Sequence, residues 1–252
     1  QHRGQESAGI ATANGQHIYR HTSMGLVSHA IQEQDILHLP GHIAIGHTRY
    51  STTGSCLPQN AQPIMAHAPE LELALAHNGN VINAKDMKAT LTEWGASFSS
   101  STDSEVIANL IAWAPGRTLD EKIRYMMRHI RGAYSLVILT KDSLIGVRDP
   151  MGIRPMCIGR LKAGWIIASE SCALDHLGAK FLREIDPGET VIINDNGLSS
   201  IPPAVQAPRK AFCIFEHIYF SRPDSILDGQ IVYTTRQKMG MNLAIEHPVE
   251  AD

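Results

Sequence analysis

Apolar residues alternate with polar or small ones in several short segments of the chain, which is the spacing of β-strands. HIAIGHTRY carries Ile43 and Ile45, and LELALAHNGN carries Leu71, Leu73 and Leu75 at every second position. Further along, apolar runs come in pairs around short polar turns, at residues 133–140 with 144–147, 156–160 with 165–168, and 191–193 with 198–201. These pairs predict β-hairpins, most clearly at Asn196-Gly197, because Asn-Gly suits a turn with positive φ.

Three segments in the middle of the chain have helical spacing instead. One is expected to begin at Asn83 and a second at Asp103 or Ser104, with an apolar stripe along each. The third begins with Thr118 in T-L-D-E, a capping-box pattern. A further helix is expected over residues 233–246.

The order of these elements bears on fold class. Strands come first, then helices, then a run of hairpins. This order predicts an α+β fold with antiparallel sheets and argues against repeated βαβ units. The segment IPPAVQAPRK, with three prolines, is typical of a linker or crossing segment.

Composition narrows the class of protein further. Of the 252 residues, 43% are hydrophobic and 19% charged, which is ordinary for a soluble globular protein. Lys and Arg total 22 against 25 acidic residues, for a net charge of −3. The absence of a basic excess argues against nucleic acid and against an anionic membrane as partners.

The four cysteines and thirteen histidines give no metal motif by themselves. No C-x-x-C pair and no H-E-x-x-H occurs, and scattered histidines are more often structural than ligands. An even cysteine count in a chain of this length does not imply disulfides, so a reducing compartment is expected.

Three short motifs carry candidate chemistry. In HTRYSTTG, Arg49 ends a predicted strand, and its planar guanidinium can bind a carboxylate in bidentate fashion. The alternative is a surface arginine paired with a nearby acid. In STDSEVI, Asp103 can hold a cationic group of a ligand, although an aspartate there more commonly caps the helix that follows.

AHNGN is the third motif. Asn-Gly after a strand is most often a turn. The functional alternative is an oxyanion hole, formed by the side-chain amide of Asn78 and the backbone N–H of Gly79. Arg49, Asp103 and this pair together describe a receptor for an amino-acid amide such as glutamine. A nucleophile is missing, because no cysteine lies in a segment typical of an activated thiol.

QHRGQESAGIA, GHTRYSTTG, AHNGN, STDSEVI, RDPMGIRP, SESCAL and IYFSRPDS together resemble the amidophosphoribosyltransferase family, over essentially the whole chain. HTRYSTTG and HNG are shared by class II glutamine amidotransferases in general, whereas QHRGQES and IYFSRPDS discriminate within that superfamily. The resemblance implies an N-terminal-nucleophile hydrolase fold, a four-layer αββα sandwich with antiparallel sheets. It also implies that residues 1–205 form an N-terminally truncated glutaminase domain, and that residues 206–252 comprise a linker and the truncated beginning of a phosphoribosyltransferase domain.

The same resemblance implies roles for individual residues. Arg49 matches the family's binder of the glutamine carboxylate, Asp103 the binder of its ammonium, and Asn78 and Gly79 the oxyanion hole. The family's nucleophile is an N-terminal cysteine, expected upstream of the QHRGQES stretch. We therefore expect the chain as printed to show no glutaminase activity.

In the family, ammonia from glutamine passes to phosphoribosyl pyrophosphate, with Mg²⁺, to give 5-phosphoribosylamine, the first committed step of purine synthesis. By resemblance, Cys213 is one ligand of a possible [4Fe–4S] cluster whose other ligands lie outside this chain, since a single thiolate cannot hold such a cluster. The resemblance further implies a cytoplasmic homo-oligomer inhibited by purine nucleotides.

Two alternatives stay open at this point. One is another class II amidotransferase, such as a glucosamine-6-phosphate or asparagine synthetase. The QHRGQES and IYFSRPDS stretches argue against it. The other is a non-catalytic homologue or partial gene product. The presence of the candidate site residues argues against it: Arg49, Asn78, Gly79 and Asp103.

Overall fold

The computed structural model describes residues 1–50 and 55–250 and divides the chain into two compact units. Unit 1 comprises Gln1, Arg3–Arg154 and Ile185–Ala211. Unit 2 comprises His2, Pro155–Glu184 and the chain from Phe212 onward. The domain boundary expected between residues 205 and 206 stays a prediction.

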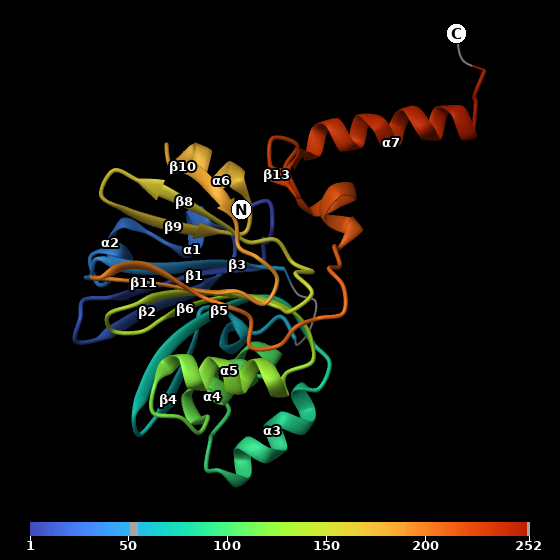
Figure 1. Cartoon of the computed structure of the whole chain (residues 1–252). Helices are drawn as coiled ribbons and strands as arrows, with labels where there is room; N and C mark the ends of the chain where they lie inside the picture. The colour runs from blue at the N-terminus through green and yellow to red at the C-terminus, as the bar shows by residue number, and fades with distance from the viewer. Residues whose placement is uncertain (51–54, 251–252) are drawn as a thin grey trace. The chain divides into compact units, whose positions relative to one another are not determined.

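Unit 1 is built on two antiparallel sheets (Figure 1). The larger has the order β12-β11-β7-β6-β5-β4 and the smaller β2-β1-β3. The strands of the larger sheet are β4 (Ile64–Ala68), β5 (Leu71–Val81), β6 (Gly132–Leu139), β7 (Leu144–Arg148), β11 (Thr190–Asn194) and β12 (Gly197–Ile201). Those of the smaller sheet are β1 (Ser7–Ala13), β2 (Ile18–Met24) and β3 (Ile43–Arg49).

Strand β5 shows why these two sheets stack. Its leucines Leu73 and Leu75 enter a large core shared with the helices, whereas Ala74 and Ala76 enter a second core shared with β1 and β3. Successive side chains of a strand point to opposite faces, so one alternating sequence serves both layers. The second core is rich in alanine, and these small side chains allow close approach of the two sheets.

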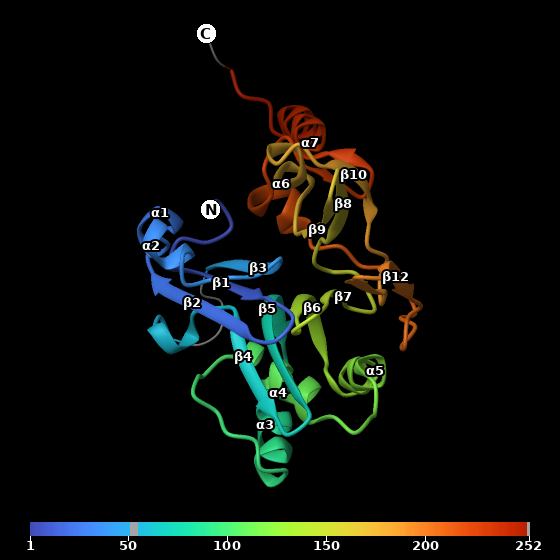
Figure 2. The ribbon, with the colours of Figure 1, turned by 90° about the vertical axis from the view of Figure 1, so that its left-hand side faces the viewer.

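Helices complete the layers of unit 1 (Figures 1 and 2). Three helices pack on the leucine face of the larger sheet: α3 (Ala84–Glu93), α4 (Asp103–Trp113) and α5 (Leu119–His129). The short helix α1 (Val27–Ala30) lies against β1 and β2, with α2 (Glu33–Ile36) following it. Unit 1 thus has the helix, sheet, sheet, helix order of the predicted αββα sandwich.

Unit 2 contains a three-stranded antiparallel sheet with the order β10-β8-β9 and a small core that includes Leu174. Its elements are β8 (Cys157–Leu161), β9 (Gly164–Ala168), α6 (Ser171–His176), β10 (Lys180–Glu184), the short helix η2 (Glu216–Phe220), β13 (Ile226–Leu227), β14 (Gln230–Ile231) and α7 (Val232–Glu246). No helix among the described residues is both long and apolar enough to span a membrane.

The predicted hairpins and helices are confirmed, with two differences in the caps. Thr118 forms the expected capping box of α5. Asn83 precedes α3, but its side chain bonds the backbone at His129 and Arg131 and makes no capping bond to α3. The cap of α4 is Thr102, whose hydroxyl accepts from the backbone N–H of Glu105, so the expectation that Asp103 or Ser104 caps this helix is wrong.

Candidate functional site

Arg49 ends strand β3 and is only 4% exposed. Its Nη1 donates to Glu6 Oε2 at 3.2 Å, and the backbone N–H of Glu6 donates to the carbonyl of Arg49 at 3.1 Å. A buried guanidinium needs an anionic partner, and Glu6 supplies one. The alternative from the sequence was a surface arginine paired with an acid. Arg49 does have an acidic partner, but it is buried and not on the surface.

Gly4 allows the QHRGQES stretch to lie directly against the backbone of Arg49. A Cβ atom on Gly4 would lie 2.5 Å from the carbonyl carbon of Arg49 and 2.6 Å from the carbonyl oxygen of Thr48. No real Cβ contact is that short, so only glycine allows the N-terminal segment to lie flat against the end of β3.

Asn78 and Gly79 lie within strand β5, where they pair with Ser135 and Tyr134 of β6. The turn, which is the commoner structure for Asn-Gly, is therefore wrong here. A Cβ atom on Gly79 would lie 2.0 Å from the carbonyl oxygen of Ala133, so this position requires glycine. The Nδ2 atom of Asn78 is buried and has no hydrogen-bond partner among the described residues. A buried amide donor without a partner is costly, and a ligand oxygen would satisfy it.

Asp103 is the first residue of α4 and joins this helix to β5. Its Oδ2 accepts the backbone N–H of Val81 at 2.9 Å, and its Oδ1 lies 3.8 Å from Nδ1 of His77. The carboxylate is 7% exposed. Asp103 is thus placed at the end of the strand that carries Asn78 and Gly79.

Asn60 connects the Arg49 segment to the Asp103 segment. Its Nδ2 donates to the carbonyl of Ser55 at 2.6 Å, and that carbonyl also accepts from Arg49 Nη1 at 3.4 Å. Its Oδ1 accepts the backbone N–H of Ser101 at 3.1 Å. Asn60 is fully buried, so this bridge is a fixed part of the structure. Residues 51–54 of the HTRYSTTG motif lie outside the described residues.

A second bridge joins the two sheets. His47 Nε2 contacts the carbonyl of His77 at 3.2 Å, which links β3 to β5. The backbone N–H of His77 donates to Gln62 Oε1 at 2.7 Å, and Gln62 Nε2 donates to Ser104 Oγ at 3.1 Å. These hydrogen bonds form a buried network that joins the segments of the four predicted residues, although the side-chain amide of Asn78 takes no part in it.

Both histidines of this network are held neutral. Burial lowers the pKa of His47 to about 4, against a weaker raising effect of its bond to the His77 backbone. Burial also lowers the pKa of His77, although the nearby Asp103 carboxylate opposes that shift. With both imidazoles neutral, the charged groups of the site include the Arg49 guanidinium, which is paired with Glu6, and the Asp103 carboxylate.

Sequence reasoning missed the supporting residues of this network: His47, Asn60, Gln62, His77, Ser104 and Glu105. Two of them stand within the candidate motifs, since His47 precedes Thr48-Arg49 and His77 precedes Asn78-Gly79. Their position next to the candidate residues was the signal in the sequence that could have identified them. Asn60 and Gln62 carry no such signal, because their partners lie far away in the sequence.

Cys213, the predicted cluster ligand, lies just before η2, and its carbonyl accepts the backbone N–H of Glu216 at 2.9 Å. Among residues 1–50 and 55–250, three or more possible ligand side chains gather in one place, at His2, Glu170 and Cys172, which does not include Cys213. The residues described here therefore do not provide a [4Fe–4S] site around Cys213, and its role as a ligand stays a prediction.

Comparison with known proteins shows the family of this chain. A family model described as a glutamine amidotransferase domain matches residues 47–176. The chain is 42% identical to the amidophosphoribosyltransferase of Mus musculus, 44% to that of Methanocaldococcus jannaschii and 48% to that of Synechocystis sp.. Each alignment covers 100% of this chain and 54%, 57% and 52% of the relative, so the chain spans about half the length of the curated relatives it matches.

A solved structure matches over the same range. The glutamine phosphoribosylpyrophosphate amidotransferase of B. subtilis, complexed with ADP and GMP, superposes with a TM-score of 0.92 at 41% identity. The match covers 100% of this chain and 55% of that one. It confirms the N-terminal-nucleophile hydrolase fold predicted from the sequence. This chain belongs to the family of glutamine amidotransferase domains.

Proposed function

We propose that this chain is the glutamine-binding part of an amidophosphoribosyltransferase. The whole protein would hydrolyse glutamine to glutamate and ammonia, and transfer the ammonia to phosphoribosyl pyrophosphate to give 5-phosphoribosylamine and pyrophosphate. The names of relatives 42–48% identical over the full chain support this activity. It is the first committed step of purine synthesis, and a second matching structure is that of an allosteric regulatory enzyme of purine biosynthesis.

The observation that carries the proposal is the convergence of the predicted residues. Asn60 joins the segments of Arg49 and Asp103, and Asp103 is bonded to the strand of Asn78 and Gly79. A cation, an anion and an unpartnered amide donor thus lie in segments that buried hydrogen bonds join. Glutamine has the complementary groups: a carboxylate, an ammonium and an amide carbonyl.

Each of these protein groups has its own role in the proposed hydrolysis of glutamine. Arg49 binds the α-carboxylate and Asp103 the α-ammonium, which fixes the substrate at one end. Asn78 Nδ2 and the Gly79 N–H stabilise the negative charge that develops on the amide oxygen when a thiolate attacks.

The cysteines of the printed chain do not supply that thiolate. Burial raises the pKa of Cys157 to about 12 and also raises the pKa of Cys172, which disfavours the thiolate form of both. The family's nucleophile is an N-terminal cysteine, and none of the four cysteines at positions 56, 157, 172 and 213 matches its place. We therefore propose that the printed chain binds glutamine without hydrolysing it.

Further properties of the whole protein belong to the same proposal. These are Mg²⁺ for the transferase reaction, Cys213 as a ligand of an iron–sulfur cluster, purine nucleotides as inhibitors, assembly as a homo-oligomer and a cytoplasmic location. The presence of ADP and GMP in the B. subtilis complex supports the purine nucleotides.

Calorimetric titration with three ligands tests the assignment of each residue. The ligands are L-glutamine, 4-aminobutanamide, which lacks the α-carboxylate, and glutaramate, which lacks the α-amine. Arg49→Ala should weaken glutamine binding roughly 10- to 100-fold, the usual worth of a hydrogen-bonded charge pair. It should leave the affinity for 4-aminobutanamide unchanged. Asp103→Asn should weaken glutamine binding but leave the affinity for glutaramate unchanged.

Arg20→Ala is the matched control, because Arg20 is an exposed arginine of β2 in the same sheet. If Arg49→Ala weakens all three ligands equally, Arg49 supports the fold and does not bind the carboxylate. Release of glutamate by the printed chain would contradict the proposal that it lacks a nucleophile.

A further inference from the structure

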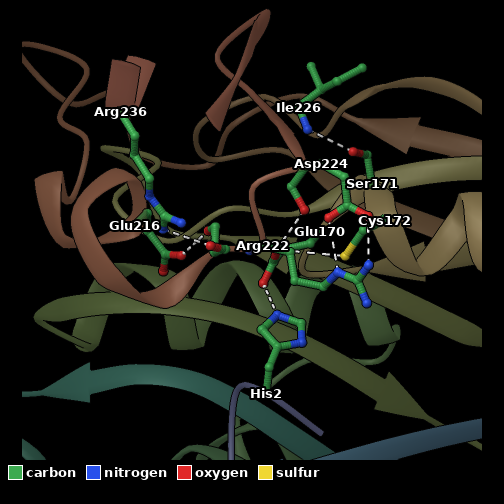
Figure 3. Close-up of polar contacts among 11 residues, drawn as sticks. His2, Glu170, Ser171, Cys172, Glu216, Arg222, Asp224, Ile226 and Arg236 are labelled. Carbon is green, nitrogen blue, oxygen red and sulfur yellow. Dashed lines mark hydrogen bonds and ion pairs between the residues drawn. The ribbon is translucent and has the colours of Figure 1, made fainter. Parts of the chain in front are cut away.

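Three side chains of unit 2 lie close together, one of them a buried carboxylate, and none of them belongs to the glutamine site (Figure 3). Nε2 of His2, a carboxylate oxygen of Glu170 and Sγ of Cys172 all lie within 4.8 Å of one another. Glu170 is 2% exposed and Cys172 9% exposed, whereas the His2 side chain is 37% exposed. This arrangement gives two enclosed ligand atoms and one that is reached from solvent.

The two oxygens of Glu170 face different partners. Oε1 lies 2.7 Å from His2 Nε2, and Oε2 lies 3.7 Å from Cys172 Sγ. Oε2 also accepts the Ser225 hydroxyl at 2.6 Å and the backbone N–H of Arg222 at 2.8 Å. These donors orient the carboxylate in advance, as outer-shell hydrogen bonds orient the ligands of metal sites.

The backbone around the cluster is held in the same way. Glu170 directly precedes α6, and Ser171 Oγ accepts the backbone N–H of Ile226 at 2.8 Å. The guanidinium of Arg222 forms two hydrogen bonds with its own partner Asp224, at 2.9 and 2.7 Å. Its positive charge is thus matched by a neighbouring carboxylate.

We propose that His2, Glu170 and Cys172 form a binding site for Zn²⁺. One imidazole nitrogen, one thiolate and one carboxylate oxygen are ligands that zinc takes, and three protein ligands leave a fourth position for water. Calcium and magnesium prefer all-oxygen sites, so the nitrogen and sulfur ligands disfavour them. The charges of Glu170 and the Cys172 thiolate would balance the dication.

Zinc requires small adjustments of this geometry. The ligand atoms of a tetrahedral zinc site lie roughly 3.3–3.7 Å apart, given metal–ligand distances of about 2.0–2.3 Å. Nε2 of His2 must therefore retreat from Oε1 of Glu170, which its exposed side chain can do. Binding replaces the S–H proton of Cys172, which passes to solvent. Since Oε2 keeps its bonds to Ser225 and Arg222, bound zinc would also hold the turn at residues 222–225.

Cobalt substitution tests this site directly. The 252-residue chain is prepared with a short N-terminal extension, so that no free amine next to His2 can bind metal. Titration with Co²⁺ should give one equivalent of bound metal and a thiolate-to-cobalt charge-transfer band. Zn²⁺ should displace it. Cys172→Ser should remove the band, and His2→Ala should weaken metal binding by at least about tenfold.

Cys157→Ser and Cys213→Ser are the controls, because both cysteines belong to the same unit but not to this cluster. Both variants should keep the band. The proposal fails if no band forms, if the band survives in Cys172→Ser, or if it disappears in Cys213→Ser. Should Cys172→Ser not fold, the exposed His2→Ala and His2→Gln variants decide, and unchanged metal affinity in both overturns the proposal.

Discussion

At the scale of single residues, Gly79 shows how closely the backbones of β5 and β6 approach. Gly79→Ala would place a methyl group 2.0 Å from the Ala133 carbonyl oxygen and 2.6 Å from the His77 ring. We expect a loss of at least about 1–3 kcal/mol in the free energy of unfolding, measured with urea, because a backbone atom has to move. Gly46→Ala in β3 is the control, since its added Cβ would meet only an ordinary contact at 3.6 Å. An equal loss in both variants would contradict this reasoning.

His47 gives a pH dependence at the same scale. Its pKa is about 4 in the folded protein against about 6.5 in an unfolded chain. Between these values the unfolded chain binds the extra proton and the folded one does not, so stability falls as the pH falls from 6.5 towards 4. The unfolding free energy should decrease between pH 7 and pH 5, and we expect this decrease to be smaller by about 1–2 kcal/mol in His47→Gln. An unchanged slope would show that the pKa of His47 is the same in the folded and unfolded states, which would contradict its neutral state below pH 6.5.

At the scale of elements, α4 and α5 show what local sequence can and cannot predict. T-L-D-E predicts the start of α5 because its cap and partner are both local and exposed. The same logic fails at α4, where Asp103 bonds Val81 of a strand 22 residues away and leaves the cap to Thr102. The turn expected at Asn78 and Gly79 is wrong for a similar reason. The pairing of this segment with β6 is a long-range contact, and it overrides the local preference of Asn-Gly.

The two helices also allow a matched comparison of their glutamates, which stand at the third position of α4 and of α5. Glu105 is buried and accepts two backbone N–H groups and two hydroxyls, from Ser99 and Ser100, at 2.7–2.9 Å. Glu121 accepts two backbone N–H groups at an exposed site.

We expect Glu105→Gln to cost several-fold more unfolding free energy in urea than Glu121→Gln, roughly 2–4 against 1 kcal/mol or less. The buried carboxylate accepts four hydrogen bonds. The glutamine side chain would place its own N–H donors against some of these four donors, which would leave them without an acceptor. Glu105→Gln should also weaken glutamine binding, because Asp103 lies in the same helical turn. Equal costs in the two variants would show that burial of Glu105 does not matter.

At the scale of the whole molecule, the antiparallel strands of unit 1 were predictable because alternation along each strand reports burial directly, whereas their stacking as a sandwich was implied only by the resemblance to the family. The contacts of unit 2 that surround Glu170 were not predictable, although SESCAL and IYFSRPDS both stand out as motifs. The two motifs meet through contacts of more than 50 residues in sequence separation, such as those of Glu170 with the Ser225 hydroxyl and with the backbone N–H of Arg222. No local pattern encodes such pairs.

The two proposed sites lie in different units, which gives a prediction for the molecule as a whole. A ligand stabilises the part of the protein that binds it, by an amount set by its concentration relative to its Kd. In hydrogen exchange, glutamine should therefore slow exchange in unit 1, most strongly at residues 77–81 and 99–105, which surround the site. Zn²⁺ should slow exchange in unit 2, at residues 170–174 and 221–226. Arg49→Ala should remove only the first effect and Cys172→Ser only the second. If zinc protection appears in unit 1 and survives Cys172→Ser, the metal binds elsewhere, and the assignment of one site to each unit is wrong.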